Sequence, residues 1–173
     1  NTDGEGFCLA LEEATGETTM GKDVAILGAG GAARAIGAAL IRTGLSSLVF
    51  INRSLENARR VQSAIGATAA IELGPEALHD LEVSVDLVVN TLPVAANPLL
   101  AALDLAPLPD HAVVTDINYQ QAGPILLRRA DSNGLMTLDG RGMFLWQAAL
   151  SFERWTGVAP DLELGRTVLR MPG

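Results

Sequence analysis

The sequence has few of the residues that form disulfides, metal sites and protonated amines: one cysteine, two histidines and one lysine among 173 residues. The single cysteine, Cys8, cannot form a disulfide within the chain, which predicts a reducing compartment, the cytoplasm. His79 and His111 have no partners at the spacing of metal ligands, so the sequence predicts surface histidines and no metal site.

Aromatic and basic residues are also scarce. Aromatics make up 4% of the chain, whereas alanine, glycine, leucine and valine dominate, and this balance favours helices packed closely on a sheet. A net charge of −8 argues against non-specific binding to nucleic acid or an anionic membrane, because both require basic surface. No apolar run approaches the ~20 residues of a membrane span. We therefore expect a small-molecule substrate as partner, with no nucleic acid and no membrane.

Short apolar runs alternate with helical patterns along the whole chain. Apolar runs bounded by glycines predict strands, and apolar residues three and four apart predict helices. Strands are expected at 23–27, 47–51, 67–71, 85–90, 112–116 and 136–138, and helices at 4–15, 30–43, 55–65, 75–81, 98–102, 123–133, 142–155 and 160–169. This alternation implies βαβ units. The predicted class is α/β: a doubly wound, mostly parallel, Rossmann-like sheet with helices on both faces, in one domain over residues 1–173.

The segment VAILGAGGAARAIG places a glycine-rich turn between the first strand and the following helix. Gly28, Gly30 and Ala33 fit the pattern G-x-G-x-x-[GA]. In this pattern the first glycine permits the turn, the second lets the backbone approach a pyrophosphate, and the small third residue keeps the helix close to the strand. Free N–H groups at the helix N-terminus then face the anion. The sequence therefore predicts a dinucleotide site at Gly28, Ala29, Gly30, Gly31 and Ala32.

The second strand ends in INRS, at the point where NAD-binding proteins usually carry Asp or Glu to bind the ribose hydroxyls. This chain has Asn52, Arg53 and Ser54 there. A carboxylate would repel a 2′-phosphate, whereas an arginine binds it through charge-assisted hydrogen bonds. We therefore predict NADP(H) rather than NAD(H) as the cofactor. The alternative is that Arg53 is a solvated loop charge.

Three separated stretches together resemble one family. NTDGEGF, GAGGAARAI followed by INRS, and DGRGMFLWQAALSFERWTG are similar to motifs of the shikimate dehydrogenase (quinate/shikimate dehydrogenase) family, in its order and at about its spacing. VVNTLPVAA and VVTDINYQQAGPILLRRA resemble its later cofactor-side and substrate-side loops. The resemblance implies a two-domain enzyme that reduces 3-dehydroshikimate to shikimate with NADPH. This chain would be its C-terminal, nucleotide-binding half.

The resemblance also implies roles for individual residues. Asp3 matches an aspartate that pairs with a catalytic lysine beside the reacting hydroxyl, and Tyr119 and Gln147 match residues that contact the substrate. Thr91 and Leu92 match a loop near the cofactor, and the residues matched to the nicotinamide side are Ile117, Gly140 and Met143. Local sequence leaves other roles open, because Asp3 or Thr2 suits a helix N-cap, Tyr119 a half-buried packing position and Met143 the core.

Some positions depart from the family pattern. Leu92 stands where a hydroxyl residue is common, and the hydroxyl occurs one position earlier, at Thr91. Asn57 stands where some NADP-using members carry a second arginine, and Asn118 precedes Tyr119 where an apolar residue is more common. These departures weaken the prediction of NADP over NAD.

The catalytic lysine of the family has no counterpart in this sequence. The only lysine, Lys22, lies beside the first strand, far along the chain from any acid/base position that the family uses. We therefore expect a missing N-terminal domain that supplies the lysine and most of the substrate pocket. The isolated chain should bind cofactor but turn over little or no substrate.

The first and last helices are expected to pack on that missing domain and to promote association when it is absent. Three alternatives stay open at this stage. The substrate is quinate or an aminoshikimate; the chain is a stand-alone dinucleotide-binding module without catalysis; or it belongs to another two-domain dehydrogenase, such as a folate-linked one.

Overall fold

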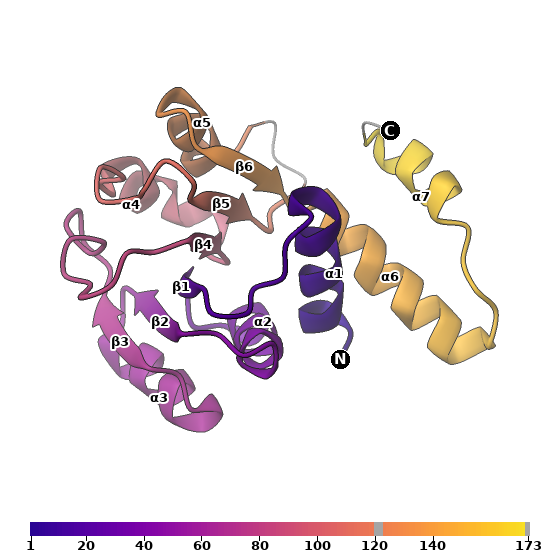
Figure 1. The fold of residues 1–173 in the computed structure, drawn as a ribbon, viewed down its shortest axis with the longest axis horizontal. Helices are drawn as coiled ribbons and strands as arrows, with labels where there is room; N and C mark the ends of the chain where they lie inside the picture. The colour runs from indigo at the N-terminus through magenta and orange to yellow at the C-terminus, as the bar shows by residue number, and fades with distance from the viewer. Residues whose placement is uncertain (120–122, 172–173) are drawn as a thin grey trace.

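The computed structural model describes residues 1–119 and 123–171, and its centre is a parallel sheet in the order β3-β2-β1-β4-β5-β6 (Figure 1). The strands are β1 (Asp23–Leu27), β2 (Ser47–Asn52), β3 (Ala69–Glu72), β4 (Leu87–Asn90), β5 (Val113–Asp116) and β6 (Met136–Asp139). After β3 the chain crosses to the middle of the sheet, where β4 pairs with β1. In such sheets, ligands bind outside the carboxyl ends of the strands at this switch point. The predicted doubly wound α/β class is confirmed.

Helices cover both faces of the sheet (Figure 1). They are α1 (Asp3–Thr15), α2 (Gly31–Arg42), α3 (Leu55–Ile65), the short 3-10 helix η1 (Val94–Ala96), α4 (Asn97–Ala102), α5 (Ile125–Ser132), α6 (Arg141–Thr156) and α7 (Leu162–Leu169). Alternate side chains of β1 point to opposite faces. Val24 and Ile26 join the core under α1, α2 and α3, whereas Ala25 and Leu27 join the core under α4 and α5. None of the described helices has the length and hydrophobicity needed to cross a membrane.

Helix α1 lies between α2 and α6 because two of its residues have no side chain. A Cβ at Gly4 would overlap the carbonyl oxygen of Ala35 in α2, and a Cβ at Gly6 would lie 2.6 Å from the backbone nitrogen of Gln147 in α6. The glycines of NTDGEGF therefore permit close helix–helix contact on two sides. This places the start of α1 beside both the glycine-turn helix and the long C-terminal helix.

Of the two residues predicted to cap α1, Thr2 holds the N-cap position, but its side chain makes no capping hydrogen bond. The other choice, Asp3, is wrong, because Asp3 is the first residue of the helix itself. The Thr2 hydroxyl is hydrogen-bonded to the hydroxyl of Ser151, 2.8 Å away in α6. The backbone N–H of Asp3 instead donates to Oδ1 of Asn1 at 2.8 Å. The Asp3 carboxylate is therefore not used to cap its own helix.

The predicted helix at 75–81 is also wrong, because residues 75–80 form consecutive turns. A helix would require the carbonyl of Pro75 to accept the N–H of His79. That carbonyl instead accepts the N–H of Asp104 at 2.8 Å, and His79 N–H donates to Glu76. A contact from a distant segment thus replaces the helical bond.

The other predicted elements are present: the strand at 23–27 and the helix at 55–65 have the predicted bounds, and the rest have shifted ends. The third strand begins at Ala69 rather than 67, because the N–H of Ala67 still donates to the carbonyl of Gln62 at the end of α3. Of the predicted domain, residues 120–122 and 172–173 lie outside the described part of the chain.

Candidate cofactor and active site

The residues predicted to bind a cofactor follow the carboxyl ends of five strands. The glycine turn follows β1, Asn52 to Ser54 end β2, Thr91 and Leu92 follow β4, Ile117 follows β5, and Gly140 follows β6. Since all strands are parallel, these segments lie along one edge of the sheet. The fold therefore brings the predicted cofactor residues to the edge where dinucleotides bind in this class of sheet.

The glycine turn has the geometry that close approach of a phosphate requires. Gly28 has φ 115°, and a Cβ there would overlap the hydroxyl oxygen of Thr91. Gly30 and Gly31 face open space, because a Cβ added at either residue would have no contact within 4 Å. The first N–H that donates within α2 is that of Arg34, to the carbonyl of Gly30 at 3.1 Å. The N–H of Gly28 donates to the carbonyl of Ile51, but those of residues 29–33 have no acceptor among the described residues, so the turn fits a pyrophosphate.

The end of β2 is arranged around one free guanidinium. The side-chain amide of Asn52 donates to the carbonyl of Ser54 at 2.9 Å, and the Ser54 hydroxyl caps α3 by accepting the N–H of Asn57 at 3.3 Å. Arg53 is exposed and makes no hydrogen bond or ion pair within residues 1–119 and 123–171. Asn52 and Ser54 therefore fix the backbone at the end of β2, and the guanidinium of Arg53 between them keeps all its N–H groups available for a ligand.

The hydroxyl of Thr91, which lies one position earlier than the hydroxyl common in the family, stabilises the contact between two strand ends. Thr91 donates from both its backbone N–H and its hydroxyl to the carbonyl of Leu27, each at 2.8 Å. This holds the segment after β4 against the glycine turn. The predicted contact of Thr91 with a cofactor would therefore have to compete with, or share, an existing hydrogen bond.

A buried polar network that the sequence analysis missed connects the segments after β4 and β5. Asn90, 0% exposed, donates from its side-chain amide to the carboxylate of Asp116, 2% exposed, at 2.8 Å. Asn118 donates to the other carboxylate oxygen of Asp116 from its backbone N–H at 2.9 Å and its side-chain amide at 2.6 Å. The sequence signal was the pair of polar residues ending two apolar strands, Asn90 and Asp116.

The predicted nicotinamide-side residues beyond β5 and β6 lie against one another. A Cβ at Gly140 would overlap the carbonyl oxygen of Ile117, so only glycine fits at that position. Ile117, Gly140 and Met143 all line a cavity of about 570 Å³ bounded by α1, the ends of β5 and β6, the start of α6, and α7. The glycine turn is not part of the lining. These three residues therefore share a cavity, whereas Gly30 and Gly31 of the glycine turn face open space.

The predicted substrate residues follow one line of contacts across α1 and α6. The Tyr119 ring stacks on Phe144, with ring centroids 4.5 Å apart and planes inclined by 26°. Gln147 is three residues further along α6 and packs on Gly6, which is three residues after Asp3 in α1. The side chains of Asp3 and Gln147 make no hydrogen bond or ion pair with any residue in the described part of the chain. Both are free to bind a partner.

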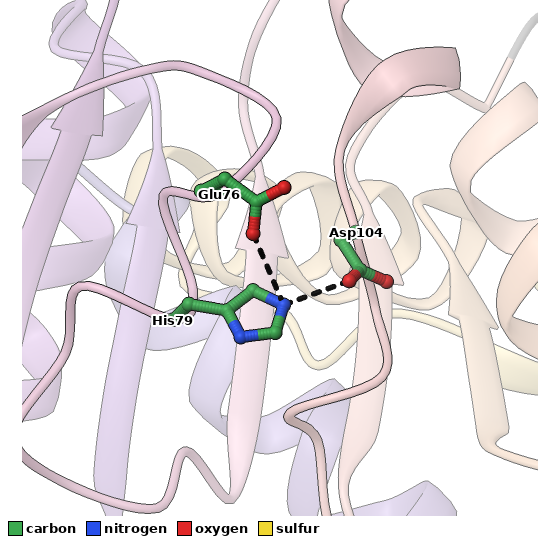
Figure 2. Close-up of side chains that lie close together, drawn as sticks. All are labelled: Glu76, His79 and Asp104. Atoms are coloured by element: carbon green, nitrogen blue, oxygen red, sulfur yellow. Dashed lines mark hydrogen bonds and ion pairs between the residues drawn. The ribbon is translucent and has the colours of Figure 1, made fainter.

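Outside this edge, residues 1–119 and 123–171 contain one group of possible metal ligands that spacing did not reveal, Glu76, His79 and Asp104 (Figure 2). Nε2 of His79 lies 2.7 Å from Asp104 and 3.4 Å from Glu76. The hydrogen bond with Asp104 raises the pKa of His79 above its ordinary value. The side chains lie at the surface, and both carboxylates pair with His79, as in a surface ion-pair cluster. The absence of a metal site stays a prediction.

Comparisons with known proteins agree with this geometry. The family model of the shikimate 5'-dehydrogenase C-terminal domain matches residues 140–170. The shikimate dehydrogenase (NADP(+)) of Mesorhizobium japonicum is 43% identical over 165 residues, covering 94% of this chain and 58% of that protein. The shikimate 5-dehydrogenase of Thermus thermophilus, solved in complex with NADP(H) and shikimate, has a TM-score of 0.79 and 31% identity, covering 98% of this chain and 62% of that one.

A quinate dehydrogenase is similar to the same extent. The enzyme of Corynebacterium glutamicum, solved in complex with NAD, has a TM-score of 0.80 and 28% identity, covering 98% of this chain and 62% of that one. The chain therefore spans about three-fifths of the length of the relatives it matches.

Proposed function

This chain is a relative of the shikimate dehydrogenases, similar to their C-terminal part, and we propose that it is the NADP(H)-binding half of such an enzyme. The whole enzyme would reduce 3-dehydroshikimate to shikimate. The observation that carries the proposal is the free guanidinium of Arg53 at the end of β2, where an NAD-binding protein usually has a carboxylate. An arginine there suits a 2′-phosphate, which a carboxylate would repel.

The bound cofactor would supply a hydride to the carbonyl carbon of the substrate, and the carbonyl oxygen would then take up a proton. In this chain, the N–H groups of Gly31 and Ala32 would bind the pyrophosphate, and Gly140 and Ile117 would border the nicotinamide. Asp3 would accept a hydrogen bond from the ammonium group of a lysine that donates the proton. Gln147 and Tyr119 would hold the substrate from the α6 side.

The lysine must come from outside this chain. Lys22, the only lysine, precedes β1 and pairs with Glu17 at 2.6 Å. Because Lys22 lies at the amino end of β1, it is on the sheet edge opposite the glycine turn. This supports a separate N-terminal domain as the source of the proton donor, and it supports low or no turnover by the isolated chain.

An exposed apolar surface on α6 and α7 suits the attachment of that domain. Trp155 is 85% exposed, Val168 72% and Leu164 62%, and Phe152 and Val158 are also exposed. Isolated apolar side chains are common on protein surfaces, but several on adjacent elements favour an interface. We propose that these two helices pack on the N-terminal domain. A monomeric sedimentation profile of this chain at high concentration would contradict the expectation that the bare surface promotes self-association.

The first test is a calorimetric titration of this chain with NADPH and then with NADH. Tighter binding of NADPH would support a self-sufficient NADP half. Preference for NADH would overturn the assignment of the cofactor and favour a quinate-oxidising relative. Binding of neither would contradict the proposal for the chain as it stands.

The second test assigns the substrate. The complete enzyme should form NADPH from NADP in the presence of shikimate. The alternative function is that of a quinate dehydrogenase, and the similarity to the Corynebacterium glutamicum enzyme is the observation that favours it. Turnover of quinate with NAD, without turnover of shikimate, would support that alternative. Tight binding of NADPH with no dehydrogenase activity in the complete protein would favour a binding module instead.

A further inference from the structure

The carboxylate of Asp116 is buried at the carboxyl end of β5, beside β4, and no cation among the described residues forms a hydrogen bond or ion pair with it. It accepts one hydrogen bond from Asn90 and two from Asn118. A buried carboxylate is costly unless its oxygens are hydrogen-bonded. The two asparagines are therefore part of what makes a charge tolerable at this position.

Asn118, like Asn90, joins Asp116 to the segment after β4, but it does so from the β5 side. Its side-chain nitrogen donates to the carbonyl of Leu92 at 3.0 Å as well as to Asp116 at 2.6 Å. Both neighbours are acceptors, so the orientation of the amide is fixed by its surroundings. One amide group thus ties the backbone after β4 to the end of β5.

The tied segment lies against the glycine turn. A Cδ of Leu92 is 3.4 Å from the position of a Cβ at Gly28, and the N–H of Leu92 donates to Oδ1 of Asn90 at 3.1 Å. On the other side of Asn118, the N–H of Ile117 donates to the carbonyl of Asn90 at 3.1 Å. Movement of Leu92 relative to Ile117 would therefore change the space between the glycine turn and the segment after β5.

We propose that Asn118 is a positioning residue for the nicotinamide half of the cofactor, and this inference rests on the proposed function. Together with Asn90, it holds Leu92 and Asp116 in place and thereby helps to fix the separation of the two segments that would flank the nicotinamide ring. The adenosine half depends on Arg53 and the glycine turn, and the hydrogen bonds of Asn118 go to Asp116 and Leu92 instead. Loss of Asn118 should therefore affect one end of the cofactor only.

The test compares two probes on the 173-residue chain and on Asn118→Leu, which keeps the size of the side chain and removes its donors. The probe 2′,5′-ADP carries only the adenosine half, and NADPH carries both halves. We expect the affinity for NADPH to fall about tenfold, in line with the loss of a hydrogen bond to a charged group. The affinity for 2′,5′-ADP should stay within about twofold, because distant sites act independently.

The fluorescence of bound NADPH gives a readout of the nicotinamide itself. Its anisotropy should be lower on Asn118→Leu, because the ring is held less firmly. Asn133→Leu is the matched control, since Asn133 is exposed at the end of α5 and its side chain has no hydrogen bond to a described residue. It should leave both affinities and the anisotropy unchanged.

A second variant, Asn118→Asp, keeps the shape but places a carboxylate against Asp116 and the Leu92 carbonyl. It should weaken NADPH binding more than Asn118→Leu does and again spare 2′,5′-ADP. Equal losses for both probes, or no loss for either, would overturn the positioning role while leaving the proposed function intact. Failure of the unaltered chain to bind either probe would overturn the proposed function, and this inference with it.

Discussion

The two ends of the proposed cofactor site are built in opposite ways. At the end of β2, Arg53 is exposed and unpaired within the described segments, ready for an anion. At the ends of β4 and β5, Asn90, Asp116 and Asn118 are joined to one another in a largely buried network. One end therefore offers donors to a ligand, whereas the other uses its donors to fix its own shape. Changes at the first should alter affinity, and changes at the second should alter stability and geometry.

Gly140→Ala, at the buried end, should have the strongest effect. The added Cβ would overlap the carbonyl oxygen of Ile117, so the backbone between β6 and α6 must shift. We expect unfolding in urea to show a loss of about 2–3 kcal/mol, typical of overpacking against backbone. Gly74→Ala is the control, because the same methyl meets open space there, outside any helix, and should leave the unfolding free energy nearly unchanged. Equal stability of both variants would contradict the described contact.

The next effect is that of Asn90→Leu, which preserves volume but breaks the network. The Asp116 carboxylate loses one donor, and the N–H of Leu92 loses its acceptor. We expect a loss of about 2 kcal/mol in the free energy of unfolding, the cost of leaving buried polar groups unpaired. If Asn90→Leu unfolds at the same urea concentration as the unaltered chain, the network does not stabilise the fold.

At the exposed end, Arg53→Ala should change binding without changing stability. Loss of charge-assisted hydrogen bonds to a 2′-phosphate should weaken NADPH binding about tenfold or more, and NADH binding by little. Arg59→Ala, which removes an exposed charge from the following helix, is the matched control in calorimetric titration. Equal losses for NADPH and NADH would show that Arg53 does not distinguish the two cofactors.

The weakest effect belongs to the exposed cluster of Glu76, His79 and Asp104, which tests whether surface pairing alone stabilises the fold. The hydrogen bond with Asp104 raises the pKa of His79 above its ordinary value of 6.5. The stability that the protonated His79 adds to the fold is therefore complete below pH 6.5 and is lost as the pH rises through the raised, folded-state pKa. The pKa of Asp104 is lowered, first by the N–H of Ala106 and then by His79, so its contribution is lost as pH falls below its ordinary 3.8.

Asp104→Asn should therefore destabilise the chain slightly at pH 5–6 and less at pH 8, where His79 is neutral. Thermal unfolding at the two pH values measures the difference. A larger destabilisation at pH 8 than at pH 5–6 would contradict the ion pair.

Most of the fold could be predicted because its signals are local. Apolar runs such as 23–27 specify buried strands, and glycine in place of a side chain specifies the turn at Gly28. The candidate site was predicted where its residues follow strand ends in a recognisable order. The helix at 75–81 failed because the carbonyl of Pro75 is taken by the N–H of Asp104, a contact that no local pattern encodes.

Local residue patterns were sufficient for the class of the sheet, the glycine turn and the arginine at the end of β2. Each depends on residue types at short spacing, whose conformational preferences act within a few bonds. The folded chain was needed to show that Gly4 and Gly6 are packing residues, that Gly140 lies against Ile117, and that Asn118 joins two strand ends. These features depend on atoms brought together from distant segments, where steric contact and hydrogen bonding act over a few ångströms regardless of sequence separation.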